Sequence, residues 1–135
     1  MFLSVNWTSG NYPERLYRAL LHSSTVLTAW DGDRLVGLIR ALDDTAMLAQ
    51  IHYVLVHPAY HGQGIAGHML ELIKEKYRDF LYIEAMPEDK KNVPFYEKHG
   101  FSVMEKGVAI QIWHDLEPEN EGGPEQSDDR RGERE

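Results

Sequence analysis

The sequence contains no cysteine, and lysine and arginine together account for only 14 of its 135 residues. Without cysteine, these residues offer no disulfide bond, no thiolate metal ligand and no cysteine nucleophile. No lysine or arginine lies between Ala41 and Ile73, so this stretch lacks the basic side chains with which proteins bind nucleic acid. We therefore expect no nucleic acid partner.

Long apolar runs are also absent. No stretch approaches the roughly 18 apolar residues that a membrane span needs. The first ten residues, MFLSVNWTSG, lack the basic and continuously apolar segments of a signal peptide. We therefore expect no membrane partner and a cytoplasmic location.

Aromatic and aliphatic residues are missing from residues 117–135, which read EPENEGGPEQSDDRRGERE. Eight acids and three arginines give this segment a charge of −5 out of the formal −8, which leaves −3 for residues 1–116. Such a composition cannot bury enough apolar surface to fold, so it predicts a disordered acidic C-terminal tail. Residues 1–116 show no internal repeat and have the size of one domain.

The apolar periodicity within residues 1–116 predicts alternating strands and helices. Strands are expected at 2–7, 25–30, 34–42, 46–56, 80–86, 101–105 and 108–114, and helices at 11–24, 65–78 and 93–99. The last two strands are predicted to close the sheet as an antiparallel pair. The order β-α-β-β-β-α-β-α-β-β predicts an α/β (α+β) fold, with a mixed, mostly antiparallel central sheet and helices on both faces.

Local signals mark several ends of these elements. The Asp-Gly dipeptide between the second and third strands is typical of a tight hairpin turn. Pro13 and Pro94 suit the first turns of their helices, Asn92 can cap the last helix, and Gly100 suits the position just after that helix.

A strand is followed directly by a glycine-rich turn in HPAYHGQGIAGHML, residues 57–70. Gly62, Gly64 and Gly67 lie where the next helix starts, and the first N–H groups of a helix can hold an anion such as phosphate. The segment lacks the Lys-Ser/Thr of a Walker loop and the full Gly-x-Gly-x-x-Gly of a dinucleotide fold. Taken alone, the loop is equally well interpreted as a turn that binds nothing.

Two motifs together resemble a known family. VLVHPAYHGQGIAGHMLELIKE, residues 54–75, followed by VPFYEKHGF, residues 93–101, resembles the GNAT superfamily of acetyl-CoA-dependent N-acetyltransferases. The resemblance implies a single GNAT-like domain that uses acetyl-CoA as co-substrate. In that family the glycine loop binds the pyrophosphate of coenzyme A, and the preceding strand pairs with the pantetheine arm.

The resemblance also implies which positions contact the coenzyme. These are Val54, Leu55 and Val56 for the pantetheine and acetyl carbonyl; His61, Gly62, Gln63, Gly64, Ile65, Ala66 and Gly67 for the phosphates; Asp89 and Asn92 for the pantetheine arm; and Tyr96 beside the sulfur. Two positions depart from the family pattern. His61 replaces Gln or Arg, and its neutral imidazole has one donor where Arg has five. Asp89 replaces an Asn.

Acetyl transfer to an amine by direct attack needs a proton acceptor for the amine, donors for the developing oxyanion and a proton for the leaving thiolate. Strand alternation predicts Gln50, His52 and Val54 on one face, which makes His52 the first candidate base. Glu84 is the second, because some protein N-terminal acetyltransferases of the superfamily use a glutamate there. Tyr96 is the candidate acid, since the pKa of a phenol, near 10, is close to that of a thiol, near 8.5.

Several interpretations remain open at this stage. The leading hypothesis is an enzyme that acetylates the primary amine of a small molecule. One alternative is an acyl-CoA-binding sensor without catalysis, and another is acetylation of a protein N-terminus or lysine. His57 and His61 are four residues apart, but Pro58 prevents a helix between them and no third ligand is evident, so we expect no metal. A homodimer is expected by analogy with the family.

Overall fold

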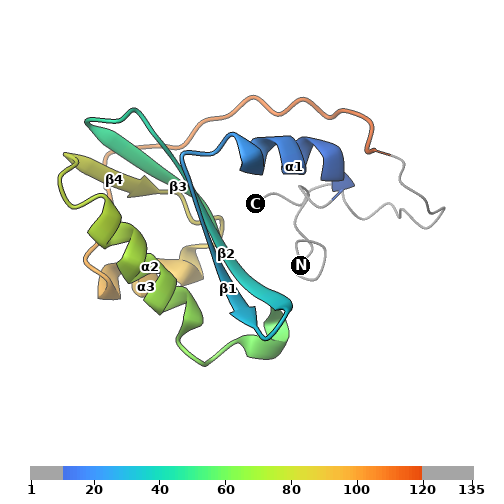
Figure 1. Cartoon of the computed structure of the whole chain (residues 1–135). Helices are drawn as coiled ribbons and strands as arrows, with labels where there is room; N and C mark the ends of the chain where they lie inside the picture. Colours follow the sequence, from blue (N-terminus) through green and yellow to red (C-terminus); the bar gives the residue numbers. More distant parts are fainter. Residues whose placement is uncertain (1–10, 120–135) are drawn as a thin grey trace.

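A mixed sheet of four strands forms the centre of the chain in a computed structural model, which describes residues 11–119 (Figure 1). The elements are α1 Pro13–Leu21, β1 Thr25–Asp31, β2 Arg34–Asp43, β3 Leu48–Val56, the 3₁₀ turn η3 Pro58–Tyr60, α2 Ile65–Lys76, β4 Tyr82–Ala85, the 3₁₀ turn η4 Lys90–Asn92 and α3 Val93–Lys98. The strands lie in the order β1-β2-β3-β4; β1–β2 and β2–β3 are antiparallel and β3–β4 is parallel. The predicted mixed sheet is confirmed, whereas the predicted strand at 2–7 lies outside the described residues.

The β1–β2 hairpin closes through the predicted Asp-Gly turn. Asp31 pairs with Arg34, so Gly32 and Asp33 alone form the loop. Gly32 has a φ of 63°, in the left-handed region that two-residue hairpin loops require and that glycine adopts without steric penalty.

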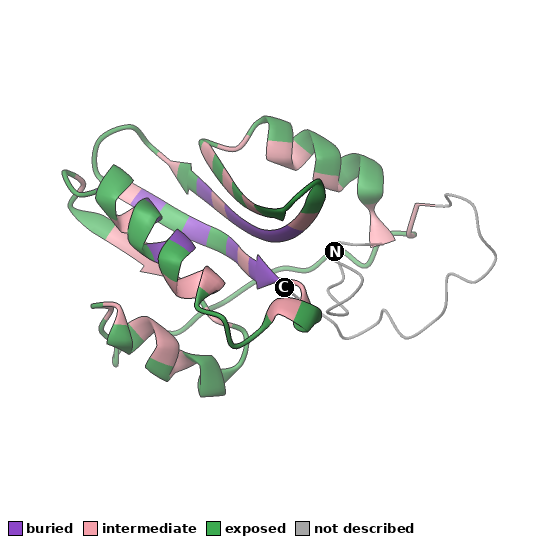
Figure 2. Ribbon diagram, turned by 60° about the horizontal axis from the view of Figure 1, so that its bottom comes forward, coloured by how far each residue is buried: buried purple, intermediate pink, exposed green. Residues whose placement is uncertain are grey.

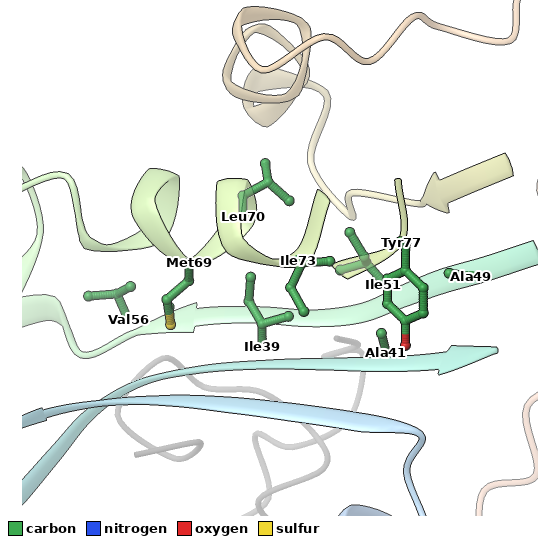
Figure 3. Packing of buried hydrophobic residues seen from close by; sticks show 9 residues of the cluster. All are labelled: Ile39, Ala41, Ala49, Ile51, Val56, Met69, Leu70, Ile73 and Tyr77. Atoms are coloured by element: carbon green, nitrogen blue, oxygen red, sulfur yellow. The ribbon is translucent and has the colours of Figure 1, made fainter. Parts of the chain in front are cut away.

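Helices cover both faces of the sheet, as predicted. One face packs against α2, whose buried side chains recur at helical spacing. The buried residues lie on the strands of the sheet, on α2 and at its C-cap (Figure 2). The cluster on this face consists of Ile39, Ala41, Ala49, Ile51, Val56, Met69, Leu70, Ile73 and Tyr77 (Figure 3). A smaller cluster on the opposite face consists of Leu38, Tyr53 and Leu55, packed against Leu16 and Leu20 of α1.

A β-bulge interrupts β3 at His52. Arg40 of β2 pairs with Tyr53 and Ala41 pairs with Ile51, so His52 is an extra residue on β3. Ile51 therefore packs beneath α2, while Tyr53, two residues later, packs beneath α1.

The bulge reverses which side chains face which helix. In a regular strand, residues two apart share a face. Because the alternation reverses at His52, Gln50 and Val54 fall on opposite faces, and the prediction that Gln50, His52 and Val54 share one face is wrong.

Residues 101–114 do not form the predicted closing pair of strands. The structure assigns no strand to residues 101–119, and this segment runs from α3 past β4 toward α1 (Figure 1). Val108, Ile110 and Ile112 are 84%, 90% and 82% exposed. Alternating apolar residues express a preference for strand, but a strand forms only where a neighbouring edge offers hydrogen bonds. The predictions at 101–105 and 108–114 are therefore wrong for this structure.

The end of the described chain is attached to the start of α1. The Tyr12 hydroxyl donates to the Leu116 carbonyl at 2.9 Å, and the Glu119 carboxylate accepts from the backbone N–H groups of Glu14 at 2.6 Å and Arg15 at 3.2 Å. First-turn N–H groups have no partner within a helix, and α1 has no capping side chain at its N-cap. Contacts thus continue past the predicted boundary at residue 116; residues 120–135 lie outside the described part, so disorder of the tail stays a prediction.

Candidate functional site

A groove of ≈ 590 Å³ opens between the end of β3, the start of α2, the loop after β4 and α3. The β3–β4 pairing ends at Ile51 and Ala85. Beyond this point the two segments separate, and residues that follow each strand line the groove. It brings together most of the residues predicted from the sequence: His52, Val54, Val56, His61, Gly62, Gly64, Ile65, Ala66, Gly67, Asp89, Asn92 and Tyr96.

Three predicted residues do not line this groove. Leu55 is buried in the cluster beneath α1, so its side chain points to the opposite face of the sheet. Gln63 lines a second hollow, between α2 and β1. Glu84 lies on β4 opposite Gln50 and is partly buried outside the groove wall.

The start of α2 leaves its backbone uncovered toward the groove. Gly62 and Gly64 have φ values of 82° and 81°, and a Cβ added to either would meet no atom within 4 Å. Gly64 occupies the N-cap position of α2, and no side chain makes a capping hydrogen bond there. The first-turn N–H groups and the positive end of the helix dipole therefore form a backbone site that suits an anion.

Gly67 is required for a different reason, because it makes room for His99 of α3. A Cβ on Gly67 would lie 3.0 Å from Nε2 and 3.2 Å from Cε1 of the His99 imidazole. The His99 ring also donates from Nδ1 to the Glu71 carboxylate at 2.6 Å. Gly67 thus allows α2 and α3 to approach at the groove wall.

This packing predicts a coupling between Gly67 and His99. Glycine inside a helix costs about 0.5–1 kcal/mol relative to alanine. In a protein that carries His99→Ala, where the ring is gone, Gly67→Ala should raise the free energy of unfolding by that amount. In the protein with His99 intact, the same substitution should raise it by at least about 0.5 kcal/mol less. Urea unfolding of the four proteins measures the difference; equal effects in both backgrounds would contradict the packing role.

The His61 imidazole is bonded to the end of β3. Its Nε2 lies 2.7 Å from the carbonyl oxygen of Val56. Because a carbonyl only accepts, Nε2 carries the hydrogen, and in the neutral ring Nδ1 has none to donate. The single donor of neutral His61 is therefore already used by the protein backbone.

Tyr96 is positioned by the end of α3. Gly100, at φ 95°, donates to the Glu97 carbonyl at 3.1 Å, and the Phe101 N–H donates to the Tyr96 carbonyl at 3.0 Å. These two bonds form a Schellman motif, so the predicted glycine after the helix is confirmed. The motif brings the Phe101 ring edge-on to Tyr96 at 5.5 Å. Burial raises the pKa of Tyr96 above its usual value near 10, so the hydroxyl is protonated at neutral pH.

Asp89 and Asn92 lie on the loop that leads into α3. Asp89 accepts from the Lys91 N–H at 3.0 Å and caps the short turn η4. Asn92 occupies the N-cap position of α3 but makes no side-chain capping hydrogen bond, so its predicted capping role is wrong in that detail. Both residues line the groove.

His52 is paired with Arg40 across the bulge. Arg40 Nη1 lies 2.5 Å from His52 Nδ1, and Arg40 Nε donates to the Ser23 hydroxyl at 2.7 Å. A guanidinium has only donors, so Nδ1 accepts and the hydrogen of the neutral imidazole is on Nε2. Sequence reasoning did not identify Arg40, Glu71 or His99; His99 lies within the motif VPFYEKHGF, but the contacts of Arg40 and Glu71 depend on the fold.

The described residues contain no helix long and apolar enough to cross a membrane. Within the same residues, no group of three or more His, Cys, Asp or Glu side chains is arranged to hold a metal ion. The cytoplasmic location and the homodimer stay predictions.

Curated relatives match most of this chain but only part of their own length. A histone acetyltransferase of Glycine max is 33% identical over 100 residues, which are 71% of this chain and 43% of that protein. A mycothiol acetyltransferase of Corynebacterium glutamicum is 29% identical over 111 residues, which are 78% of this chain and 37% of that protein. The chain thus spans less than half the length of these two relatives.

A solved structure matches the fold along nearly its whole length. An acetyltransferase of Streptococcus pneumoniae described as a GNAT family protein superposes with a TM-score of 0.71 at 29% identity, covering 87% of each chain. The family model described as "Acetyltransferase (GNAT) family" matches residues 2–101, which include the glycine loop, the groove and Tyr96. The chain therefore belongs to the acetyltransferase (GNAT) family.

Proposed function

We propose that this protein transfers the acetyl group of acetyl-CoA to the primary amine of a small molecule, by direct attack in a ternary complex. One observation carries the proposal: a single groove contains both the uncovered start of α2, at Gly62 and Gly64, and Tyr96. The first feature suits phosphates and the second suits a departing thiolate. Acetyl-CoA carries phosphates at one end and a thioester at the other.

In this proposal the backbone binds most of the coenzyme. The N–H groups at the start of α2 hold the pyrophosphate, and the main chain of Val54, Leu55 and Val56 pairs with the pantetheine arm and the acetyl carbonyl. Asp89 and Asn92 border the pantetheine from the loop before α3. The positive φ values and open surroundings of Gly62 and Gly64 support this arrangement, because a side chain at either position would project where phosphates must approach.

Tyr96 is proposed as the general acid. Attack of the amine on the thioester carbonyl forms a C–N bond; the C–S bond then breaks and sulfur leaves with its electron pair. The Tyr96 hydroxyl gives that sulfur a proton. Burial keeps the phenol protonated at neutral pH, and its proton affinity is close enough to that of a thiolate for transfer in the transition state.

Two residues remain candidates for the base that accepts the proton of the amine. His52 lines the groove, but its Nδ1 accepts from Arg40 and its Nε2 carries the hydrogen, so it can take a proton only after the Arg40 contact breaks. Glu84 lies on β4 outside the groove wall and would need a water molecule as relay. Replacing each in turn, His52→Gln and Glu84→Gln, and comparing pH profiles of turnover distinguishes them.

The class of acceptor is proposed from the relatives. The mycothiol acetyltransferase supports a small molecule, and the histone acetyltransferase supports a protein amine as the alternative. A panel of small primary amines beside lysine-containing and N-terminal peptides, assayed for thiol release from acetyl-CoA, separates the two.

Coenzyme binding is the first test of the proposal. Acetyl-CoA should raise the melting temperature in a concentration-dependent way, since a ligand that binds the folded state stabilises it. Thiol release with at least one amine should follow. Binding without turnover across the whole panel would favour a coenzyme sensor, and the absence of any thermal shift would reject both functions.

A further inference from the structure

We infer that His99 donates a hydrogen bond to the pyrophosphate of the coenzyme, beside the backbone N–H groups of α2. The inference rests on the proposed function and adds a side-chain contact to it. It was not predicted from the sequence, and it follows from how α2 and α3 pack against each other at the groove.

The His99 ring extends along one turn of α2 toward the start of that helix. Gly67 and Glu71 are four residues apart, so they lie on the same side of α2 one turn from each other. The Nδ1 end of the ring bonds to Glu71, and the Nε2 end lies against Gly67. Gly67 is the third residue of α2, so Nε2 lies against the first turn, the turn whose N–H groups are proposed to bind the anion.

Glu71 determines the protonation pattern of this ring. Its hydrogen bond with His99, together with one from Lys74, holds the pKa of the Glu71 carboxyl below its usual value, so the group is a carboxylate at neutral pH. A carboxylate only accepts, so Nδ1 carries a hydrogen. Nε2 then donates only when the ring carries a second proton, and in that form the ring would donate to the Glu71 carboxylate from Nδ1 and to a phosphate from Nε2.

Both positively and negatively charged groups surround His99 in the groove. Lys74 of α2 lies 3.2 Å from Glu71, and Lys98 of α3 and His61 of the loop line the same groove. These groups and the start of α2 contribute positive charge to this part of the groove. Glu88 and Asp89, which also line the groove, contribute negative charge. A bound pyrophosphate would add negative charge to this part of the groove and would accept a hydrogen bond from a protonated His99.

The loop and first turn of α2 supply no lysine or arginine to the groove. The donor of neutral His61 is bonded to Val56. His99 is only 15% exposed and its Phe95 neighbour lies at 5.1 Å, so the ring is held in place before any ligand arrives. A fixed donor avoids the entropy cost of ordering a long side chain on binding.

Calorimetric titration of the full chain with coenzyme A and with dephospho-coenzyme A tests the inference. Both ligands contain the pyrophosphate, and only the first has the ribose 3′-phosphate. His99→Leu should lower the affinity for each of the two ligands about tenfold at pH 6. This is the lower end of what a hydrogen bond to a charged group contributes. The difference between wild type and variant should shrink as the pH rises to 8.5, because the imidazolium is lost.

Three further variants keep the result interpretable. His68→Leu removes a histidine from the exposed side of the same helix, outside this groove, and should leave both affinities unchanged. His99→Gln keeps a neutral donor, so it should bind with an intermediate affinity that does not vary with imidazole protonation. Glu71→Gln should move the loss of affinity to lower pH, a shift that a purely structural role would not produce.

Equal affinity of wild type and His99→Leu at pH 6, in a variant that still melts cooperatively, would overturn the inference. A loss confined to coenzyme A and absent for dephospho-coenzyme A would overturn it too, because the contact would then be with the ribose phosphate. Failure of the wild type to bind either ligand would instead reject the proposed function, and the inference with it.

Discussion

Gly64→Glu should weaken coenzyme binding by at least about a hundredfold. The substitution places a side chain and a negative charge at the N-cap of α2, beside the N–H groups proposed to bind the pyrophosphate. Like charges in contact cost several kcal/mol, and each 1.4 kcal/mol is a factor of ten in affinity. Isothermal titration with coenzyme A measures the change directly.

The control for this substitution is Gly32→Glu in the β1–β2 turn. Gly32 also has a positive φ and open surroundings but does not line the groove, so glutamate there carries comparable backbone strain and the same charge without occupying the start of α2. Both variants should lose about 1–2 kcal/mol of stability, the cost of a left-handed conformation in a residue other than glycine. Only Gly64→Glu should lose the coenzyme. Equal affinities in the two variants would show that the start of α2 does not bind phosphate.

Tyr96→Phe should lower turnover at least about tenfold while leaving the coenzyme dissociation constant nearly unchanged. The phenylalanine ring keeps the packing against Phe95 and Phe101, and only the proton donor is lost. A positioned general acid contributes typically a factor of 10²–10⁴, part of which water can replace. Steady-state thiol release gives the turnover, and titration gives the dissociation constant.

The pH dependence supplies a second, independent outcome for Tyr96. Because burial raises the pKa of Tyr96 above its usual value, loss of this proton should not reduce turnover until the pH exceeds about 10. Tyr77→Phe is the matched control: the Tyr77 hydroxyl bonds to Thr25 and Asp43 outside the groove, so turnover at a temperature where the variant is folded should be unchanged. Full turnover in Tyr96→Phe would reject Tyr96 as the acid.

Short sequence motifs were sufficient to predict those features that depend only on residues adjacent in the sequence. The Asp-Gly turn, the glycine after α3 and the helix that follows the glycine loop all formed as predicted, because turn geometry and helical apolar spacing are properties of short segments. The same holds for Gly62 and Gly64, whose positive φ values come from the sharp connection between β3 and α2.

Local signals failed where two distant segments decide the outcome. The bulge at His52 arises from the pairing of β2 with β3 and cannot be seen in the sequence of β3 alone. Strand alternation therefore predicted Gln50 and Val54 on the same face of the sheet, whereas they lie on opposite faces. Residues 108–114 alternate as a strand does, yet no strand edge pairs with them in the described chain, and the segment continues to its anchor on α1.

The sequence by itself determined the family, the glycine loop at a helix start and the tyrosine of the last motif, because these depend on residue type and short spacing. Only the tertiary structure decided what the histidines do. His61 bonds to the Val56 carbonyl, His52 accepts from Arg40, and His99 lies in the space that Gly67 leaves open. An imidazole can donate, accept or carry charge, and which of these it does is set by partners that the fold brings from other elements.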